Sequence, residues 1–278
     1  MRVSCLDLVK ELQQRSFRPK KRWGQNFLID DNIRQFIIEK SRLKKGENIL
    51  EVGGGCGCLT AALIEAGVNV LVFEVDRVLC EFLKEKFGTF PNFHLCCQDV
   101  LKYRWEEFPQ PLKVVSNLPY SISGAFFFRL WKTDVVPFFL VMVQKEVGER
   151  LTACAGTKQY GILTILFSLT FRVEILKTVP PSVFWPKPEV ESVIVRGTKI
   201  LNIESNTKNV LVKIANVAFK YRRKKLYKAL TMGFSGLNWK NVLSDAGIDY
   251  NLRPEDVEPD KWLILAEILK KNTLFLEG

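Results

Sequence analysis

The residue types best suited to chemistry are those of Asn117-Leu118-Pro119-Tyr120, which follow a short apolar run, Val114–Ser116. The amide oxygen of Asn117 and the backbone carbonyl of Leu118 can accept the two hydrogens of an exocyclic adenine amine. This directs the lone pair of the amine toward a methyl donor. Pro119 fixes the backbone that aims the preceding carbonyl, and Tyr120 can stack on the purine and hold it within attack distance. The target base must leave its stack to reach such a pocket; the alternative interpretation is an ordinary turn.

A glycine-rich loop lies upstream of this motif, with the sequence EVGGGCG over Glu51–Gly57. Gly53, Gly55 and Gly57 allow the backbone to turn sharply and to approach a ligand without a Cβ in the way. Glu74 ends the next expected strand, about 20 residues further on, where a carboxylate can accept hydrogen bonds from both ribose hydroxyls. The loop and the carboxylate together favour a nucleotide site over a plain strand–helix turn.

The spacing of the glycines narrows the choice of nucleotide. A G-x-G-x-G loop lacks the final G-x-x-G spacing that is expected where a dinucleotide pyrophosphate binds at a helix N-terminus. Asp99 follows the third expected strand and can accept from an adenine amino group, although a helix cap is an equal alternative for it alone. Gly53, Glu74 and Asp99 at the carboxyl ends of three successive strands therefore favour S-adenosylmethionine over NAD. We expect no metal, because the sulfonium is already activated.

The surrounding pattern alternates apolar strands with helices, which predicts a parallel sheet covered by helices on both faces, an α/β Rossmann-like fold. From Val210 onward we expect only helices, over 210–232, 238–246 and 259–271, with Asp260 as a cap of the last. The predicted domains are 1–204, which binds the nucleotide, and 205–278, an all-helical RNA-binding domain. Earlier expected helices are 31–40, capped by Asp30 or Asp31, 59–66, 77–87 and 146–151; expected strands are 48–52, 68–74, 93–97, 114–117, 137–144, 171–179 and 192–196.

The charge indicates the class of partner. The net charge of +11 and pI of about 9.3 favour nucleic acid, then anionic membrane, over a basic surface kept for solubility. We expect Arg15–Arg22 to form an exposed basic arm. We place Arg222, Arg223, Lys224 and Lys225 on one helix, where four consecutive cations cannot all face the same way.

The remaining composition excludes several classes of protein. No apolar run approaches the roughly 20 residues of a membrane span, and the N-terminus lacks a secretory pattern. Seven cysteines without a C-x-x-C pair, and His94 as the only histidine, predict neither a disulfide framework nor a zinc site. Cys56 and Cys58 are interpreted as small space-filling residues. We therefore expect a reduced, cytoplasmic monomer that does not bind membranes.

Taken together, the ordered motifs resemble those of the small-subunit ribosomal RNA adenine N6-dimethyltransferases, across nearly the whole chain. The resemblance implies that Asn26 and Leu28 contact the donor and that Phe184 is a second platform stacking on the target base. It further implies two methyl groups on each of two adjacent adenosines near the 3′ end of 16S rRNA in the small subunit, with a role in subunit biogenesis. The matching segments are Gln25–Asp30, Glu51–Gly57, Glu74, Asp99, Asn117–Tyr120, Gln144–Arg150, Val179–Ser192 and Phe219–Leu230.

Two departures from the family pattern are visible. Gly54 stands where the family usually has proline, so we expect a more flexible donor loop; Lys228 replaces an asparagine and adds charge. Two alternatives stay open: a large-subunit rRNA methyltransferase of the antibiotic-resistance type, and a non-catalytic RNA-binding assembly factor. DNA adenine methyltransferases are less favoured, because they usually carry a second proline where Leu118 stands.

Overall fold

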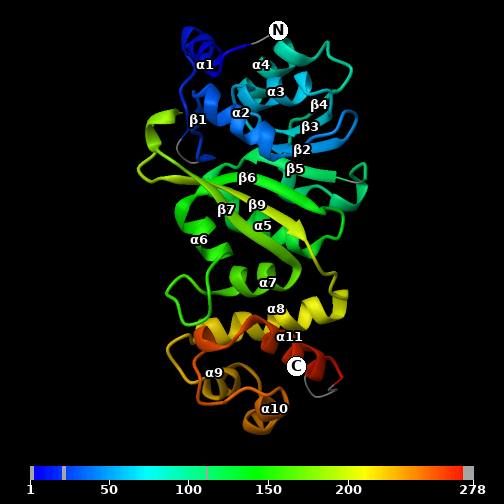
Figure 1. The fold of residues 1–278 in the computed structure, drawn as a ribbon, viewed down its shortest axis with the longest axis vertical. Coiled ribbons are helices and arrows are strands. Elements are labelled where there is room, and N and C mark those ends of the chain that lie inside the picture. Colours follow the sequence, from blue (N-terminus) through cyan, green and yellow to red (C-terminus); the bar gives the residue numbers. More distant parts are fainter. Residues whose placement is uncertain (1–2, 21–22, 111, 272–278) are drawn as a thin grey trace. The chain divides into compact units, whose positions relative to one another are not determined.

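A seven-stranded mixed sheet forms the centre of the N-terminal part of the protein (Figure 1). The computed structural model describes residues 3–20, 23–110 and 112–271. The strand order is β4-β3-β2-β5-β6-β9-β7; the first five strands are parallel, and β9 is antiparallel to β6. The strands are β2 (Asn48–Val52), β3 (Asn69–Phe73), β4 (Phe93–Cys96), β5 (Leu112–Asn117), β6 (Phe138–Gln144), β7 (Phe171–Val179) and β9 (Ser192–Lys199). The predicted Rossmann-like fold is confirmed, but the sheet is mixed rather than parallel throughout, because β9 runs antiparallel to β6.

The strands form where continuous apolar runs are buried, as in sheets covered on both faces. Leu50, Val72 and Val114 are fully buried in neighbouring strands. Asp30 caps α2 by accepting from the Ile33 backbone N–H at 2.9 Å, which decides between the two expected caps. The helices of this part are α1 (Cys5–Gln14), α2 (Asp31–Lys40), α3 (Cys58–Glu65), α4 (Arg77–Phe87), α5 (Ser123–Lys132) and α6 (Lys145–Leu151); α1 and α5 were not predicted.

A second, two-stranded sheet joins segments that are far apart in the sequence. β1 (Phe27–Leu28) pairs antiparallel with β8 (Phe184–Trp185), and Leu28 lies opposite Phe184. Both strands are too short to produce an alternating pattern, so the sequence did not predict them. They bring the segment Gln25–Asp30 against the segment Val179–Ser192.

The basic segment that begins at Arg15 is not a free arm, which corrects the expectation from sequence. Arg15 forms ion pairs with Glu11 and Glu85 at 2.8 Å each. Phe17 is buried, and the Lys20 ammonium contacts Asp76 at 3.1 Å. Acidic partners at α1 and α4 thus hold Arg15 and Lys20 against the protein, whereas Arg18 is exposed; residues 21 and 22 lie outside the described residues.

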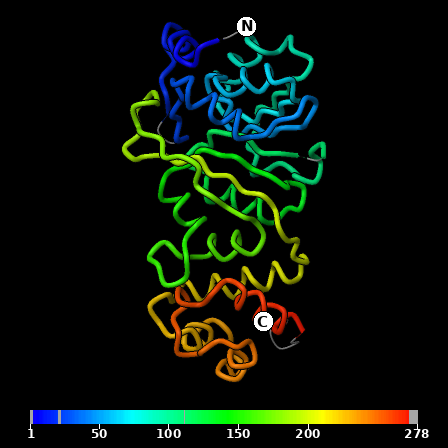
Figure 2. The backbone as a smooth tube through the Cα atoms, in the orientation of Figure 1, coloured from blue at the N-terminus to red at the C-terminus, as the bar shows by residue number. Residues whose placement is uncertain are grey.

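The chain divides into two compact units, one ending at Gly148 and resuming over 174–198, the other comprising 149–173 and continuing from Lys199. This differs from the single boundary expected near residue 204, because α7 (Ile162–Thr170) packs with α8 (Ser205–Lys220) and α11 (Pro259–Lys270). Figure 2 follows the chain from β9 into α8. The second unit also contains α9 (Leu226–Gly233) and α10 (Trp239–Asp245).

Two details of the second unit correct the sequence analysis. The expected helix over 210–232 is two helices, and residues 221–225 form the turn between them. The N-cap of α11 is Glu258 rather than Asp260 and makes no side-chain cap bond; Pro259 occupies the first helical position, which requires no N–H partner.

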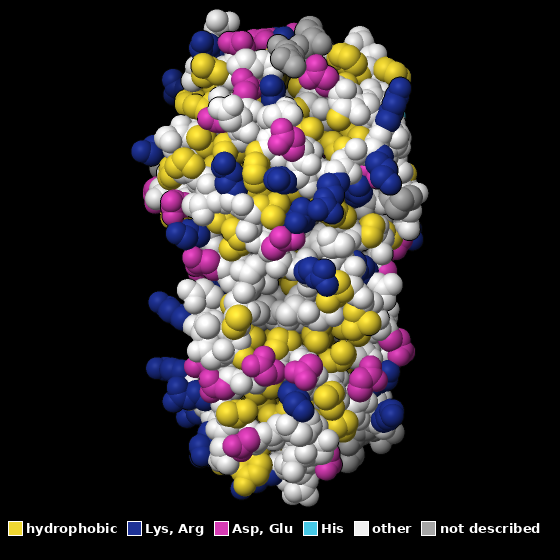
Figure 3. Space-filling view, viewed as in Figure 1, with side chains coloured by type: hydrophobic (Ala, Val, Ile, Leu, Met, Phe, Trp, Pro, Cys, Tyr) yellow, Lys and Arg dark blue, Asp and Glu magenta, His cyan; other side chains and the backbone are white. Residues whose placement is uncertain are grey.

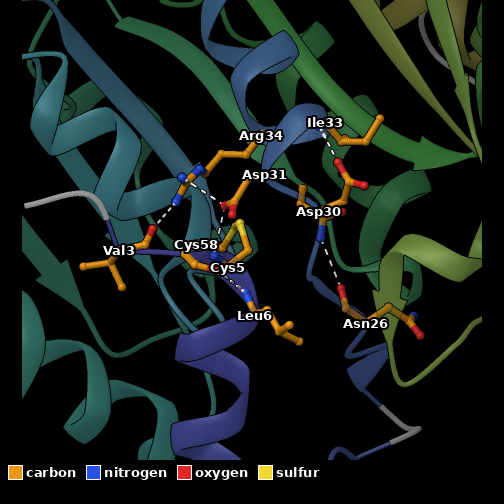
Figure 4. The surroundings of a disulfide bond; sticks show 11 residues. Val3, Cys5, Leu6, Asn26, Asp30, Asp31, Ile33, Arg34 and Cys58 are labelled. Atoms are coloured by element: carbon orange, nitrogen blue, oxygen red, sulfur yellow. Dashed lines mark hydrogen bonds and ion pairs between the residues drawn. A yellow bond between two sulfur atoms is a disulfide. The ribbon is translucent and has the colours of Figure 1, made fainter.

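Cys5 and Cys58 form a disulfide, whereas we expected all thiols to be reduced (Figure 4). The bond joins α1 to the first residue of α3, so Cys58 is more than a space-filling residue. Cys56 is buried and free, and burial raises the pKa of its thiol to about 12, so it stays protonated. The signal missing from the sequence is the proximity of α1, a helix that was not predicted.

Replacing both Cys5 and Cys58 by serine should lower the free energy of unfolding by up to about 4 kcal/mol, because the bond closes a loop with a sequence separation of 53. Urea denaturation with and without dithiothreitol measures this effect. The exposed free Cys154, replaced by serine, serves as the control. Identical wild-type unfolding curves in both conditions would contradict the expectation.

Candidate active site

A pocket opens at the carboxyl ends of β2, β3 and β5, under the segment Trp23–Leu28. It brings together every residue that the sequence nominated for donor contact and all the catalytic candidates except Phe184. Those in its lining are Asn26, Leu28, Gly53, Gly55, Glu74, Asp99, Asn117, Leu118, Pro119 and Tyr120.

The pocket exists because β2 and β5 separate before they end. Their pairing runs only to Leu50 opposite Val114. Beyond that point, the buried Ser116 hydroxyl donates to the Val52 carbonyl at 2.7 Å and accepts from the Val52 N–H at 3.3 Å. This side-chain bridge satisfies the Val52 backbone while the donor loop and the Asn117 motif diverge around the cavity.

The donor loop requires glycine for both conformation and space. Gly53 has a φ of +78°, and a Cβ there would lie 2.7 Å from Pro119 Cγ. Gly55 has a φ of +56°, and its Cβ would lie 2.9 Å from Phe27 Cδ1. Gly54 would place a Cβ 2.6 Å from Val72 Cγ1, so the proline usual in the family would require the buried neighbours to shift. Close packing therefore excludes side chains from this part of the pocket lining.

Glu74 is held by backbone groups on both sides of the pocket. One carboxylate oxygen accepts from the N–H groups of Val75 (2.8 Å) and Asp76 (3.0 Å), and the other accepts from Gly55 at 3.1 Å. Burial raises the pKa of Glu74, and these donors oppose the rise. A carboxylate has about four acceptor positions, and three are occupied, so about one remains for a ligand hydroxyl.

Asp99 both caps a short turn and lines the pocket, while its contact with an adenine stays a prediction. Its carboxylate caps the short turn Val100–Lys102 by accepting from the Leu101 N–H at 2.9 Å. The same residue lines the pocket. Capping fixes the side chain without removing it from the cavity wall.

The Asn117 motif is anchored to both neighbouring segments. The side-chain amide nitrogen of Asn117 donates to the Asn26 carbonyl at 3.1 Å. The amide oxygen of Asn117 therefore points away from Asn26. The Leu118 N–H donates to the Met142 carbonyl in β6 at 3.0 Å. The Tyr120 hydroxyl lies 2.6 Å from Ser192 Oγ, and burial raises the pKa of the phenol. All three contacts restrict the motif to one conformation.

Phe184 occupies a different position from the one expected of a stacking platform. Its side chain is 3% exposed, belongs to the hydrophobic core and is absent from the described pocket lining. It pairs with Leu28 in the small sheet. Its role toward the target base stays a prediction.

Sequence reasoning missed the residues that hold the N-terminal segment over the pocket. Gln25 donates to the buried Asp76 carboxylate at 3.1 Å and accepts from the Lys20 N–H at 2.7 Å. The Lys20 ammonium lies 4.3 Å from the ring centroid of Trp23, a pocket-lining aromatic. Asp76 could have been noticed in the sequence, because it lies two residues after Glu74 and directly before a helix. No sequence pattern indicated its distant partners Lys20 and Gln25.

Glu51 is a second missed pocket residue. It is fully buried in β2, accepts from the Thr60 hydroxyl at 2.7 Å and lines the pocket. Burial, with a smaller contribution from the nearby Glu74, raises its pKa to about 8. A charged residue inside an otherwise apolar strand was the signal. Near neutral pH its carboxyl is mainly protonated.

The four consecutive cations lie in the turn between α8 and α9, so the predicted placement on a helix is wrong. Arg222 forms an ion pair with Glu255 and donates to the carbonyls of Thr157 (3.1 Å) and Lys158 (2.9 Å). Lys225 donates to Asn251 at 2.8 Å. Arg223 and Lys224 are exposed. Figure 3 shows basic side chains distributed among acidic ones on the face in view.

The described residues contain neither a cluster of metal-ligating side chains nor a helix suited to a bilayer. Within residues 3–20, 23–110 and 112–271, no group of histidine, cysteine and acidic side chains is arranged to hold a metal ion. Over the same part of the chain, no helix is both long and apolar enough to cross a bilayer.

Comparison with known proteins decides the family. The model of the family described as ribosomal RNA adenine dimethylase matches residues 16–271. The chain belongs to the ribosomal RNA adenine dimethylase family. It is 36% identical to the ribosomal RNA small subunit methyltransferase A of Alkaliphilus oremlandii, over 98% of this chain and 99% of that protein. Identity to the protein of the same name from Clostridioides difficile is 33%, over 96% and 97% of the two chains.

Solved structures agree with this fold. A dimethyladenosine transferase from Plasmodium falciparum aligns with a TM-score of 0.73 at 24% identity, over 86% of this chain and 95% of that one. The 23S rRNA methyltransferase ErmE aligns with a TM-score of 0.65 at 25% identity, over 87% and 98%. This member of the dimethylase family is therefore a methyltransferase with the Rossmann-like sheet predicted from its sequence.

Glu51→Gln should remove a pH dependence of stability. Since the pKa of Glu51 is raised from 4.5 to about 8 on folding, the native state retains a proton that the unfolded chain has lost. The stabilising contribution of Glu51 is thus fully present below about pH 4.5 and is lost as the pH rises toward 8. The variant, which can still accept from Thr60, should gain about 1–3 kcal/mol over wild type between pH 5 and pH 7.

Urea unfolding at both pH values measures the difference, and Glu189→Gln, an exposed position, is the matched control. Parallel pH profiles for wild type and Glu51→Gln would show that Glu51 titrates normally.

Proposed function

We propose that this protein transfers methyl groups from S-adenosylmethionine to N6 of two adjacent adenosines near the 3′ end of 16S rRNA. The observation that carries the proposal is one pocket lined by both the glycine loop with Glu74 and the motif Asn117–Tyr120. Relatives at 32–36% identity are named small subunit methyltransferase A, which supports the small ribosomal subunit or its precursor as partner.

The donor site fits a ligand that has no phosphates. The pocket is lined by the glycine loop at Gly53 and Gly55, where close packing leaves no room for a Cβ, and by the buried carboxyl groups of Glu51 and Glu74. We assign the ribose to Glu74, the adenine to Asp99 and further contacts to Asn26 and Leu28. S-adenosylmethionine would supply an electrophilic methyl group, so the chain needs no metal for activation.

The protein's own part in the reaction is to bind and orient the target amine. The Asn117 amide nitrogen is occupied by the Asn26 carbonyl, which leaves the amide oxygen to accept from the amine. The Leu118 carbonyl accepts the second hydrogen in our proposal, and its N–H is held by Met142. The half-buried Tyr120, fixed by Ser192, stacks on the purine.

Phe184 reaches the base, in this proposal, only by a local change that exposes its ring from the β1–β8 sheet. Arg223, Lys224 and Lys225 are the exposed members of the basic turn, and we assign Arg223 and Lys224 to phosphates. Arg222 and Lys225 have partners within the protein. To bind RNA phosphates, they would have to exchange those partners for the phosphates.

The decisive experiment supplies labelled donor and unmethylated small subunits, then maps modified positions by primer extension. Label at two adjacent adenosines of small-subunit RNA supports the proposal. Label only in large-subunit RNA would identify the resistance-type activity, and absence of label would favour a non-catalytic assembly factor.

Asn117→Ala should lower the turnover number by about 10²-fold or more, because the amine loses its oriented acceptor. Donor affinity, measured by calorimetry, should change much less. Asn241→Ala, at an exposed position of α10, is the control. Equal turnover in Asn117→Ala and wild type would refute the role.

Binding to the small subunit should weaken steeply with salt, by about 10²-fold between about 50 and about 200 mM if roughly four phosphates are contacted. Arg223→Gln or Lys224→Gln should each reduce the slope of log affinity against log salt by about 1. Filter binding measures the slope, with the exposed Lys10→Gln in α1 as the charge-matched control. A slope near zero in wild type would remove the electrostatic interpretation.

A further inference from the structure

The second compact unit carries a cluster of tyrosine and lysine side chains that the proposed methyl transfer does not use. Tyr227, near the start of α9, and Tyr250, in the loop after α10, meet edge to face with ring centroids 5.8 Å apart and planes at 90°. Lys240 of α10 lies 5.1 Å from the centroid of Tyr227 and 5.2 Å from that of Tyr250. Lys228 lies 5.9 Å from the centroid of Tyr227. We call these four residues the tyrosine–lysine cluster.

The cluster is held in place by contacts outside the rings. The Leu226 N–H donates to the Leu252 carbonyl at 2.7 Å, which ties α9 to the loop that carries Tyr250. Lys225 donates to Asn251 at 2.8 Å across the same junction. Asp249, the neighbouring acid, accepts from the Asn251 backbone at 2.8 Å. The two rings are therefore positioned before any ligand arrives.

Exposure and charge define what the cluster can recognise. Both tyrosines are half-buried, while Lys228 and Lys240 are exposed. Two presented aromatic rings flanked by ammonium groups match the two parts of a nucleotide: a base has a π face, and its phosphate is an anion. An ordinary solvated lysine face needs no aromatic rings beneath it.

We propose that the tyrosine–lysine cluster binds unpaired RNA, with a base stacked on Tyr227 or Tyr250 and Lys228 and Lys240 on the adjoining phosphates. The Lys240 ammonium leaves the ring when the base arrives and pairs with phosphate. Bases in an A-form duplex are stacked on each other and cannot reach a ring, so the cluster selects single-stranded segments. The identification of RNA as the polyanion rests on the proposed function, but binding is measured without donor or methylation.

The test uses the full-length protein and two probes, a 12-nucleotide single-stranded RNA of mixed sequence and a blunt RNA duplex of the same length. Tyr227→Leu and Tyr250→Leu together should weaken binding of the single strand by about 10-fold or more, with an unchanged salt slope. Duplex binding should stay within about 2-fold. Lys240→Gln should lower the salt slope by about 1, and Lys10→Gln is the control.

The conservative pair Tyr227→Phe and Tyr250→Phe keeps both rings and should bind the single strand as wild type does, which separates stacking from a failure to fold. Wild-type affinity in the leucine pair, or equal loss for single strand and duplex, would overturn the proposal. The proposal would also be overturned if variants of Lys228 and Lys240 left RNA binding unchanged and weakened only the binding of the protein to phosphatidylserine vesicles. Because methylation is not the readout, an inactive wild-type enzyme would refute the proposed function and leave this result standing.

Discussion

The separation of β2 from β5 beyond Leu50 and Val114 is the constraint on which the rest of the site depends. In a parallel sheet, strands that part at their carboxyl ends leave backbone groups that must find partners. The Ser116 hydroxyl provides both partners for Val52. One side chain thereby allows a glycine loop and a catalytic motif to diverge from adjacent strands and still face one cavity.

Close packing converts that opening into a shaped site. The loop approaches Pro119 and Phe27 so closely that no Cβ fits at Gly53 or Gly55 without strain. Phe27 belongs to β1, which in turn pairs with β8. Residues of Gln25–Asp30, Glu51–Gly57 and Asn117–Tyr120 are thus mutually dependent, and a change in one segment alters the position of the others.

Polar groups around the pocket are buried with their hydrogen-bond partners, as low dielectric surroundings require. Glu74 gathers three backbone N–H donors, and Asp76 ties Lys20 and Gln25 to the start of α4. Lys20 thereby helps to hold the segment Trp23–Leu28, which lines the pocket. Arg15 and Lys20 have acidic partners within the protein, so in our proposal the exposed cations of the second unit make the phosphate contacts.

The sequence alone determined the sheet, the succession of its strands and most residues of the pocket, because apolar runs, glycine spacing and Asn117–Tyr120 are local patterns. Only the tertiary structure decided what depends on distant partners: the Cys5–Cys58 bond, the burial of Phe184 and its pairing with Leu28, and the internal ion pair of Arg222. The same holds for the turn at residues 221–225, which interrupts a continuous helical pattern. Periodicity reports which face of an element is apolar, whereas these features follow from what that face meets after the chain has folded.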